Sequence, residues 1–299
     1  MIFDDFLRDL PDVPLFRPFL YEDVNPLGGT KKARFIHAPN KAMRIVHARM
    51  IKYLRSFPKL PYATGGVPKS SPLKNVEIHR QQRFFYLMDI RRFFPSIQGE
   101  KLTEAICSRD EKLRGRENEV LDFLRNYCLR DNRLITGAPA SPDLANIFMG
   151  VLVDRGLGRL CRKYGLLYTR YLDDLTFSSK SHPIGEKKRR ALREIILAQG
   201  LEINHWKCGY YDVREKPVII TGVGVRYGGG TFLPRHYLRK LRGMIFLAKF
   251  GEISPAKVHG HMGVFFSTTN IKKREHLLSE ADWKLLEEYS QFKRLLKAA

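Results

Sequence analysis

The chain has 299 residues, and 53 Lys and Arg against 31 Asp and Glu give it a formal net charge of +22. Hydrophobic residues make up 43% of the sequence, which is enough for a buried core and excludes a wholly disordered chain. No apolar run reaches the roughly 18 residues that a membrane span needs, and the acidic N-terminus lacks the features of a secretory signal. The four cysteines are far apart and form no C-x-x-C pair, so we expect free thiols, a cytoplasmic location and no membrane partner.

The first ninety residues predict two helices followed by a buried strand. Residues 1–23 show an acidic and apolar helical pattern that prolines interrupt, and helical periodicity returns over residues 41–57. Prolines and glycines make residues 58–72 a turn-rich connection. The apolar run 83–90 has the length of a strand and carries the carboxylate of Asp89 near its end.

Positive charge is concentrated between Val24 and Val76, where eleven Lys and Arg occur without any Asp or Glu. Aromatic residues are interleaved with these cations and provide stacking surfaces beside phosphate-binding groups. We therefore favour nucleic acid as the partner over an anionic membrane surface or a solvated basic face, while composition leaves RNA and DNA undistinguished. Arg34, on an expected strand, is our candidate for a triphosphate clamp because guanidinium groups bind phosphate in a bidentate manner. Neighbouring cations compete for that role: Lys31, Lys32, Lys41 and Arg44.

The remaining two thirds of the chain alternate helices with short strands. The clearest helix is predicted over residues 141–164, with Ser141 as its N-cap, Pro142 at its first position and Gly165 after its last turn. A hairpin is predicted around Asp173 and Asp174. The other expected elements are charged helices over 100–130, a basic helix over 185–199, a strand pair over 216–225, and helices from 236 onward that end in a long charged helix over 279–299.

Three carboxylates suggest the chemistry. Asp89 closes one strand and Asp173 and Asp174 lie at the tip of a hairpin, so neighbouring strands would bring all three together. Their mutual repulsion would be relieved by a divalent cation, and oxygen ligands favour Mg²⁺, with Mn²⁺ as a substitute. Two such ions about 4 Å apart can activate a hydroxyl and stabilise a leaving pyrophosphate, which is nucleotidyl transfer. The alternative is that the Asp pair is a surface turn and Asp89 a strand-end cap.

Four ordered motifs favour the chemical interpretation. They are the segments 89–97, 137–146, 171–174 and 200–207, and in this order they resemble the palm motifs of reverse transcriptases, specifically the bacterial retron type. Two weaker signatures of retron enzymes flank them. One is Asn75-Val76-Glu77-Ile78-His79, with Val replacing the usual Ala, and the other is Ile220-Thr221-Gly222, with Ile replacing the usual Val.

The resemblance implies roles for individual residues. Asp89, Asp173 and Asp174 would be catalytic and metal-binding, and Lys207 would protonate pyrophosphate unless it is an ordinary solvated cation. Phe94 would exclude a ribose 2′-hydroxyl, although Phe93 and Phe94 should point to opposite faces of a strand so that only one lines the site. The other nucleotide-binding candidates are Gly137, which permits close backbone approach, and Thr136, which replaces the family's common Gln. The candidates for holding RNA and its primer are Asn75, His79, Thr221 and Gly222.

The resemblance also implies an α+β fold shaped as a right hand. Fingers would occupy residues 1–85, and the palm would occupy residues 86–99 and 136–232. Residues 100–135 would be an insertion shared by fingers and palm, and residues 233–299 would form a helical thumb. The palm would be an antiparallel sheet backed by helices. From Arg235 to Ala299 there are 13 Lys and Arg against 6 Asp and Glu, which suits a thumb that grips a duplex by its phosphates.

A retron-type enzyme copies part of a dedicated structured noncoding RNA into single-stranded DNA. Synthesis starts from an RNA 2′-hydroxyl, consumes dNTPs and gives a branched RNA–DNA product (msDNA), which commonly joins a separate effector protein in phage defence. The sequence leaves open a defence polymerase that is protein-primed or template-independent, and a non-catalytic RNA-binding scaffold. Oligomerisation around the RNA–DNA product is also left open.

Overall fold

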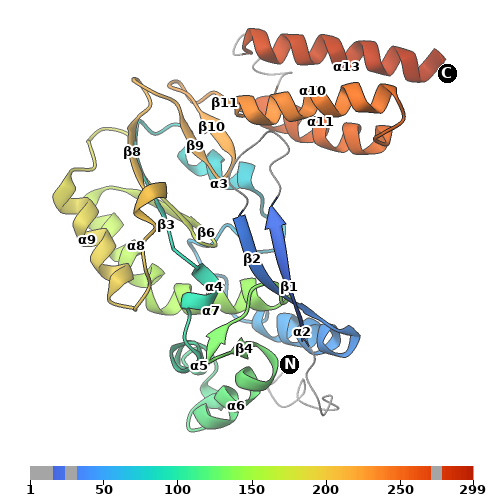
Figure 1. Cartoon of the computed structure of the whole chain (residues 1–299). Coiled ribbons are helices and arrows are strands. Elements are labelled where there is room, and N and C mark those ends of the chain that lie inside the picture. The colour runs from blue at the N-terminus through green and yellow to red at the C-terminus, as the bar shows by residue number, and fades with distance from the viewer. Residues whose placement is uncertain (1–15, 24–31, 271–277, 299) are drawn as a thin grey trace. The chain divides into compact units, whose positions relative to one another are not determined.

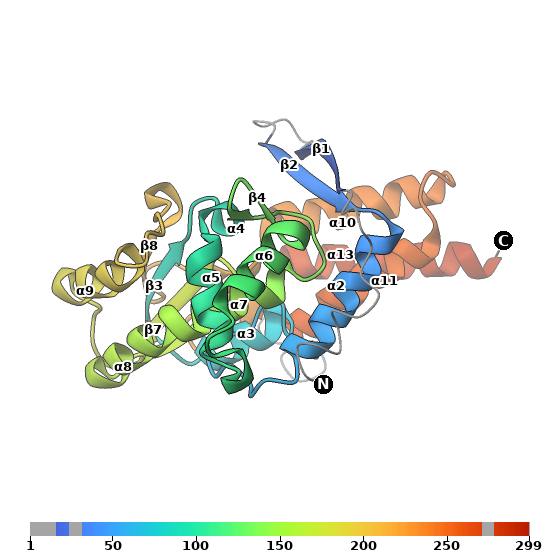
Figure 2. The same cartoon turned by 90° about the horizontal axis from the view of Figure 1, so that it is seen from below.

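A computed structural model describes residues 16–23, 32–270 and 278–298 (Figures 1 and 2). The chain divides into two compact units. The first contains residues 1–70, 88–177 and 185–208, and the second contains residues 71–87, 178–184 and 209–299. Helices and antiparallel strands are mixed along the chain, which confirms the predicted α+β class. In the described ranges, no helix combines the length and the apolar character needed to cross a membrane.

The first unit begins with an antiparallel hairpin rather than a helix. Strand β1 (Phe16–Asp23) pairs with β2 (Lys32–Pro39) over its whole length. The helix predicted over residues 1–23 is therefore wrong for its last eight residues, and its first fifteen lie outside the described residues. Pro18 disfavours a helix here because proline lacks the backbone N–H that a helical hydrogen bond needs. Both strands of a two-stranded sheet are edge strands, and edge strands tolerate a residue without that N–H.

Helices predicted from periodicity in the first unit are confirmed. α2 (Lys41–Leu54) begins at Asn40, whose side-chain oxygen accepts from the Met43 N–H at 2.8 Å. The charged region that follows contains two α-helices, a single 3₁₀ turn and a small hairpin: α5 (Gly99–Cys107), η1 (Glu111–Leu113), α6 (Glu117–Tyr127), β4 (Leu129–Arg130) and β5 (Arg133–Leu134).

The helix predicted over residues 141–164 is two helices. α7 (Ser141–Leu152) and α8 (Asp154–Tyr164) are separated by Val153, whose φ of −117° departs from the usual helical value of about −63°. Ser141 is not the N-cap, because Ala140 occupies that position and the Ser141 hydroxyl donates instead to the Ile135 carbonyl at 2.7 Å. The glycine expected after the last turn, Gly165, has a φ of +65° as predicted.

The predicted hairpin and the predicted buried strand belong to one four-stranded sheet. Its strand order is β6 (Leu167–Tyr171), β7 (Asp174–Ser179), β3 (Phe84–Asp89) and β8 (Gly209–Asp212). Leu172, in the turn between β6 and β7, has a φ of +56°. The predicted basic helix is α9 (Glu186–Leu197), and the 3₁₀ turn η2 (His205–Lys207) leads into β8.

A buried ion pair joins α8 to strand β6. Arg170 is fully buried and donates to both carboxylate oxygens of Asp154, with its Nη2 at 2.9 Å. A second guanidinium nitrogen, Nη1, donates to the Asn146 side chain at 2.8 Å and to the Leu172 carbonyl at 3.3 Å. The Tyr168 hydroxyl also donates to Asp154, at 2.7 Å. The network therefore connects α7, α8 and β6 to the turn that carries Asp173.

The second unit has two hydrophobic clusters. One packs α3 against short strands and includes Val76, Phe85 and Ile220. The other lies among three C-terminal helices and includes Leu241, Phe265 and Phe292. The elements are α3 (Pro72–His79), β9 (Val218–Ile220), β10 (Val223–Val225), β11 (Thr231–Phe232), α10 (Arg235–Lys249), α11 (Pro255–Thr269) and α13 (Glu280–Ala298), which confirms the predicted strand pair and terminal helices.

The buried ion pair predicts a large stability effect. Asp154→Asn leaves the Arg170 charge buried and uncompensated, so we expect the free energy of unfolding to fall by about 3–5 kcal/mol. Glu194→Gln is the matched control, because Glu194 pairs with Arg190 on the exposed side of α9 and its loss should cost less than about 0.5 kcal/mol. Urea denaturation measures both values. Equal effects of the two substitutions would contradict the assigned role of the Arg170 network.

Candidate active site

Asp89 lies at the end of β3 and is 4% exposed. Its Oδ1 accepts a hydrogen bond from the Asn204 side-chain amide at 2.9 Å, and its Oδ2 contacts the Lys207 ammonium. The Asn204 backbone N–H also donates to the Asp89 carbonyl at 2.9 Å. Asp89 is therefore held from both its backbone and its side chain by the segment that precedes β8.

Asp173 and Asp174 lie where the β6–β7 hairpin turns. The Asp173 carbonyl accepts from the Ile90 N–H at 3.1 Å, which ties this turn to the residue after Asp89. The pKa of Asp174 is raised to about 6, first by burial and then by the negative charges of Asp173 and Asp89, while Lys207 opposes the shift. The structure thus brings the three predicted carboxylates into one electrostatically coupled cluster.

The cluster has the donor chemistry of a divalent-cation site. Three carboxylates that repel one another are stabilised by a hard cation with oxygen ligands. The described side chains nevertheless hold no set of three or more His, Cys, Asp or Glu arranged to bind a metal. Lys207 instead supplies positive charge at Asp89. Burial lowers the pKa of Lys207, but the hydrogen bond and charge of Asp89 outweigh it, so the pKa is raised overall and the ammonium stays protonated.

Phe94 is on a helical turn, not on a strand. α4 (Phe93–Ser96) follows Arg92, so the expectation that Phe93 and Phe94 point to opposite faces of a strand is wrong. Phe93 is buried and Phe94 half-buried, and their ring centroids are 5.2 Å apart. Phe94 is therefore the ring of the two that can meet a ligand.

Thr136 and Gly137 lie against strand β2. The Thr136 carbonyl accepts from the His37 N–H at 2.8 Å, and a Cβ on Gly137, whose φ is +101°, would lie 2.4 Å from Ile36. Glycine is thus required here by the contact with β2. Thr136 also lines a pocket of about 490 Å³ together with Arg130 and Arg133. Arg34 belongs to β2 by its backbone, but its side chain lies outside the described residues.

The RNA- and primer-binding candidates lie in the second unit. Asn75 and His79 are fully buried, so their side chains do not reach the surface. The Asn75 amide reaches the Thr221 hydroxyl at 3.5 Å, and His79 Nδ1 is 2.6 Å from the Ser178 hydroxyl. Burial lowers the pKa of His79 to about 3, which keeps the ring neutral. Thr221 and the exposed Gly222 form the β9–β10 turn with φ values of +47° and +85°, a conformation that glycine favours.

Sequence reasoning did not single out two residues that organise the site. Asn204 could have been found from the sequence, because it lies in the fourth motif three residues before Lys207. Arg170 was harder to find, because its only distinctive feature is that it is a lone cation within an apolar strand. Each holds a segment that carries an aspartate, Asn204 through Asp89 and Arg170 through the Leu172 carbonyl.

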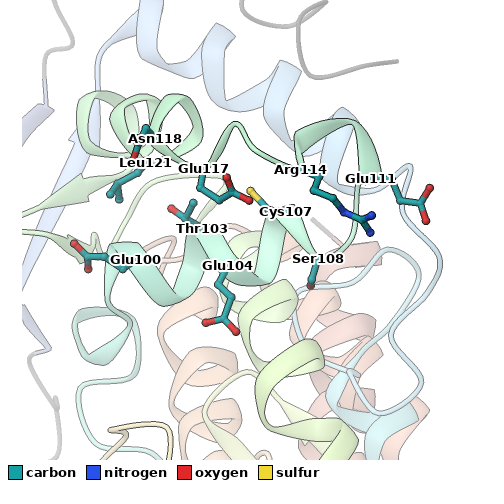
Figure 3. Close-up of a pocket in the computed structure, with 10 residues that line it drawn as sticks. All are labelled: Glu100, Thr103, Glu104, Cys107, Ser108, Glu111, Arg114, Glu117, Asn118 and Leu121. Atoms are coloured by element: carbon teal, nitrogen blue, oxygen red, sulfur yellow. The ribbon is translucent and has the colours of Figure 1, made fainter.

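A separate pocket of the first unit contains none of the predicted site residues. It measures about 480 Å³ and lies among α5, η1 and α6 (Figure 3). Four glutamates and one arginine line it: Glu100, Glu104, Glu111, Glu117 and Arg114. This excess of negative charge is unsuited to a phosphate ligand.

Comparison with known proteins identifies the family. Residues 23–225 match the family model "Reverse transcriptase (RNA-dependent DNA polymerase)". The chain therefore belongs to the reverse transcriptase family, as its motifs predict.

Curated relatives of the chain include bacterial retron reverse transcriptases. The chain is 32% identical over 193 residues to the retron Ec86 reverse transcriptase of Escherichia coli. The aligned region covers 64% of this chain and 58% of that protein. The chain is 30% identical over 228 residues to the retron Mx65 reverse transcriptase of Myxococcus xanthus, which covers 71% of this chain and 52% of that protein. The chain thus spans little more than half the length of these relatives.

A solved structure supports the right-hand polymerase fold. The telomerase from Candida albicans, solved in complex with a fragment of telomeric RNA, matches 98% of this chain and 59% of its own with a TM-score of 0.54. Sequence identity is 11%, so this likeness concerns the fold alone.

The electrostatic coupling of the cluster predicts a measurable titration. In metal-free protein the Asp174 carboxyl should have a pKa of about 6, and Asp173→Asn should lower this pKa because it removes a like charge. Lys207→Gln should raise the same pKa because it removes the opposing positive charge. Carbon-detected NMR of the aspartate carboxyls measures all three values. An Asp174 pKa that neither substitution moves would show that the groups are not coupled.

Proposed function

We propose that this protein is an RNA-directed DNA polymerase that works by two-metal nucleotidyl transfer. The observation that carries the proposal is the cluster of Asp89, Asp173 and Asp174, coupled electrostatically and held at strand and turn ends in a reverse transcriptase family member. A rigid carboxylate cluster is costly to maintain unless a cation uses it, which argues for catalysis over a purely structural role.

In this proposal the three aspartates would hold two Mg²⁺ ions, with Mn²⁺ as a substitute. The ions would activate the attacking hydroxyl and neutralise charge on the leaving pyrophosphate. Asn204 orients the Asp89 carboxylate through its amide. Lys207 stays protonated beside Asp89. It would act as the general acid by moving away from this carboxylate and donating a proton to the pyrophosphate.

The other predicted residues receive supporting roles. Phe94 would sense the sugar of the incoming dNTP, and Thr136 and Gly137, with Arg34, would border the nucleotide. Asn75 and His79 would position the Thr221–Gly222 turn for contact with RNA. Fingers, palm and thumb would keep the boundaries predicted from the sequence.

We further propose that the template is a structured noncoding RNA and that DNA synthesis starts from its 2′-hydroxyl. The names of the curated relatives support this, because they are retron reverse transcriptases. The net charge of +22 suits a protein that retains its RNA–DNA product. A cytoplasmic location, a separate effector protein and a role in phage defence complete the proposal.

The product of the native protein tests this function directly. Nucleic acid that co-purifies with the wild-type chain should contain one discrete DNA whose gel mobility shifts after RNase and after a 2′,5′-debranching enzyme. Asp173→Asn with Asp174→Asn should reduce this DNA by more than about 100-fold because the metal ligands are lost, while RNA is retained. Asp122→Asn, a carboxylate on the exposed face of α6, is the matched control and should leave the DNA unchanged.

Every other outcome favours one of the alternative functions or refutes the proposed site. DNA joined to a Tyr or Ser hydroxyl of the protein would indicate protein priming. Heterogeneous DNA without an RNA branch would indicate template-independent synthesis. RNA alone from the wild-type chain would favour a non-catalytic scaffold, and unchanged DNA from the double variant would refute the assigned catalytic site.

The half-buried ring of Phe94 predicts selection against ribonucleotides. Phe94→Ala should increase the incorporation of rNTPs relative to dNTPs by about tenfold or more, because the clash with the 2′-hydroxyl is removed. Phe94→Tyr keeps the ring and is the control. Primer extension with each nucleotide pool measures the ratio, and a ratio equal to that of the wild-type chain would remove Phe94 from this role.

A further inference from the structure

A basic groove runs along the outer side of α8 in the first unit. It measures about 1000 Å³, and its walls come from α8, the C-terminal end of α9 and the segment around Tyr62. None of the residues predicted for the active site lines it. Helices α8 and α9 lie side by side in both views of the chain (Figures 1 and 2).

Four cations line the groove, and no carboxylate does: Arg155, Arg159, Arg162 and Lys163. All four are exposed, and they follow one side of α8 at helical spacing. None of them forms an ion pair within the part of the chain that the structure describes. Arg155 is also close enough to Arg109 to lower the pKa of Arg109, after the larger effect of burial.

This charge arrangement is unfavourable for the isolated helix. Arg155 and Arg159 are four residues apart, as are Arg159 and Lys163, and like charges at that spacing destabilise a helix. The inner side of α8 is committed to packing, since Asp154, Leu157 and Cys161 are buried. The outer side is free to carry a ligand that would compensate the repulsion.

The ring of Tyr62 lies against α8 and lines the same groove. A Cβ on Gly158 would lie 2.2 Å from the Tyr62 hydroxyl oxygen, so glycine is what allows Tyr62 to lie against the helix. The Tyr62 hydroxyl accepts from Arg162 at 2.9 Å, and its carbonyl accepts from the Arg170 N–H at 2.8 Å. The groove therefore combines a row of cations with a held aromatic ring and an apolar lining that includes Leu160 and Ile195.

We infer that this groove binds the sugar–phosphate backbone of RNA outside the active site. Arginines in a row match successive phosphates, and an aromatic ring among them can stack on an unpaired base. An acidic protein segment is the competing occupant. The row of guanidinium groups beside an aromatic ring favours RNA, because the chain belongs to a family of nucleic-acid polymerases. The inference adds a second RNA contact to the proposed function and is tested separately from DNA synthesis.

The test removes charge from the groove and measures RNA binding. Arg155→Gln with Arg159→Gln is compared with Lys112→Gln and Arg114→Gln, two exposed cations of the same unit with the same total change of charge. The probe is a labelled 40-nucleotide RNA hairpin with a single-stranded tail, titrated between 50 and 200 mM salt. The groove variant should bind roughly tenfold more weakly, and its slope of log affinity against log salt should be smaller by about 1.4–1.8, because two phosphate contacts are lost.

Two further measurements separate charge from folding and from catalysis. Arg155→Lys with Arg159→Lys should restore the salt slope, because the charge is kept. DNA synthesis on a short homopolymer template with an annealed primer should be unchanged in the Gln variant. If the wild-type chain itself makes no DNA in this assay, the proposed function fails, and the RNA-binding inference is not affected. Equal RNA affinity and equal salt slope in the groove variant and the Lys112/Arg114 control would overturn the inference and favour an acidic protein as the occupant.

Discussion

The buried ion pair between Arg170 and Asp154 is the constraint on which the arrangement of the carboxylate cluster depends. A buried guanidinium must have its charge balanced and its N–H groups bonded, and here Asp154, Asn146 and the Leu172 carbonyl do both. Because the Leu172 carbonyl directly precedes Asp173, the same bonds that satisfy Arg170 orient the hairpin turn. The break between α7 and α8 serves this network, since it places Asp154 at the start of a new helix and toward β6.

In the candidate active site the buried charge is negative, and neighbouring groups balance it in the same way. Asp89 is nearly fully buried, and its charge is balanced by Lys207 and hydrogen-bonded by Asn204. Burial, and after it the charges of Asp173 and Asp89, raise the pKa of Asp174 although Lys207 opposes the shift. The three carboxylates are therefore held together by their scaffold although their charges repel one another, and a divalent cation would stabilise such an arrangement. The preformed scaffold and the repulsion among the carboxylates together favour a catalytic role for the cluster over a purely structural one.

Sequence reasoning succeeded where local chemistry determines the outcome. A strand that ends on Asp89 and a helix that ends at Gly165 follow from patterns within a few residues. It failed where a distant partner decides. Residues 16–23 form a strand because residues 32–39 pair with them, and Val153 interrupts a continuous helical pattern beside an aspartate that bonds Arg170. Phe93 and Phe94 were expected on a strand, whereas the chain turns at Arg92, which has a φ of +47°, into a short helix. The positions of the aspartates were predictable, but the groups that hold them were not.

Charge counting shows the same limit. The basic helix α9 is rich in arginine, but Glu186 pairs with Arg189 and Arg193 on its own surface. Helix α8 has a less conspicuous sequence, yet the four cations of its groove are unpaired in the described part of the chain. A net charge of +22 therefore does not spread evenly over the surface, because acidic side chains neutralise some basic segments and leave others exposed. The unpaired cations, rather than the segments with the most lysine and arginine, mark where a polyanion gains the most from binding.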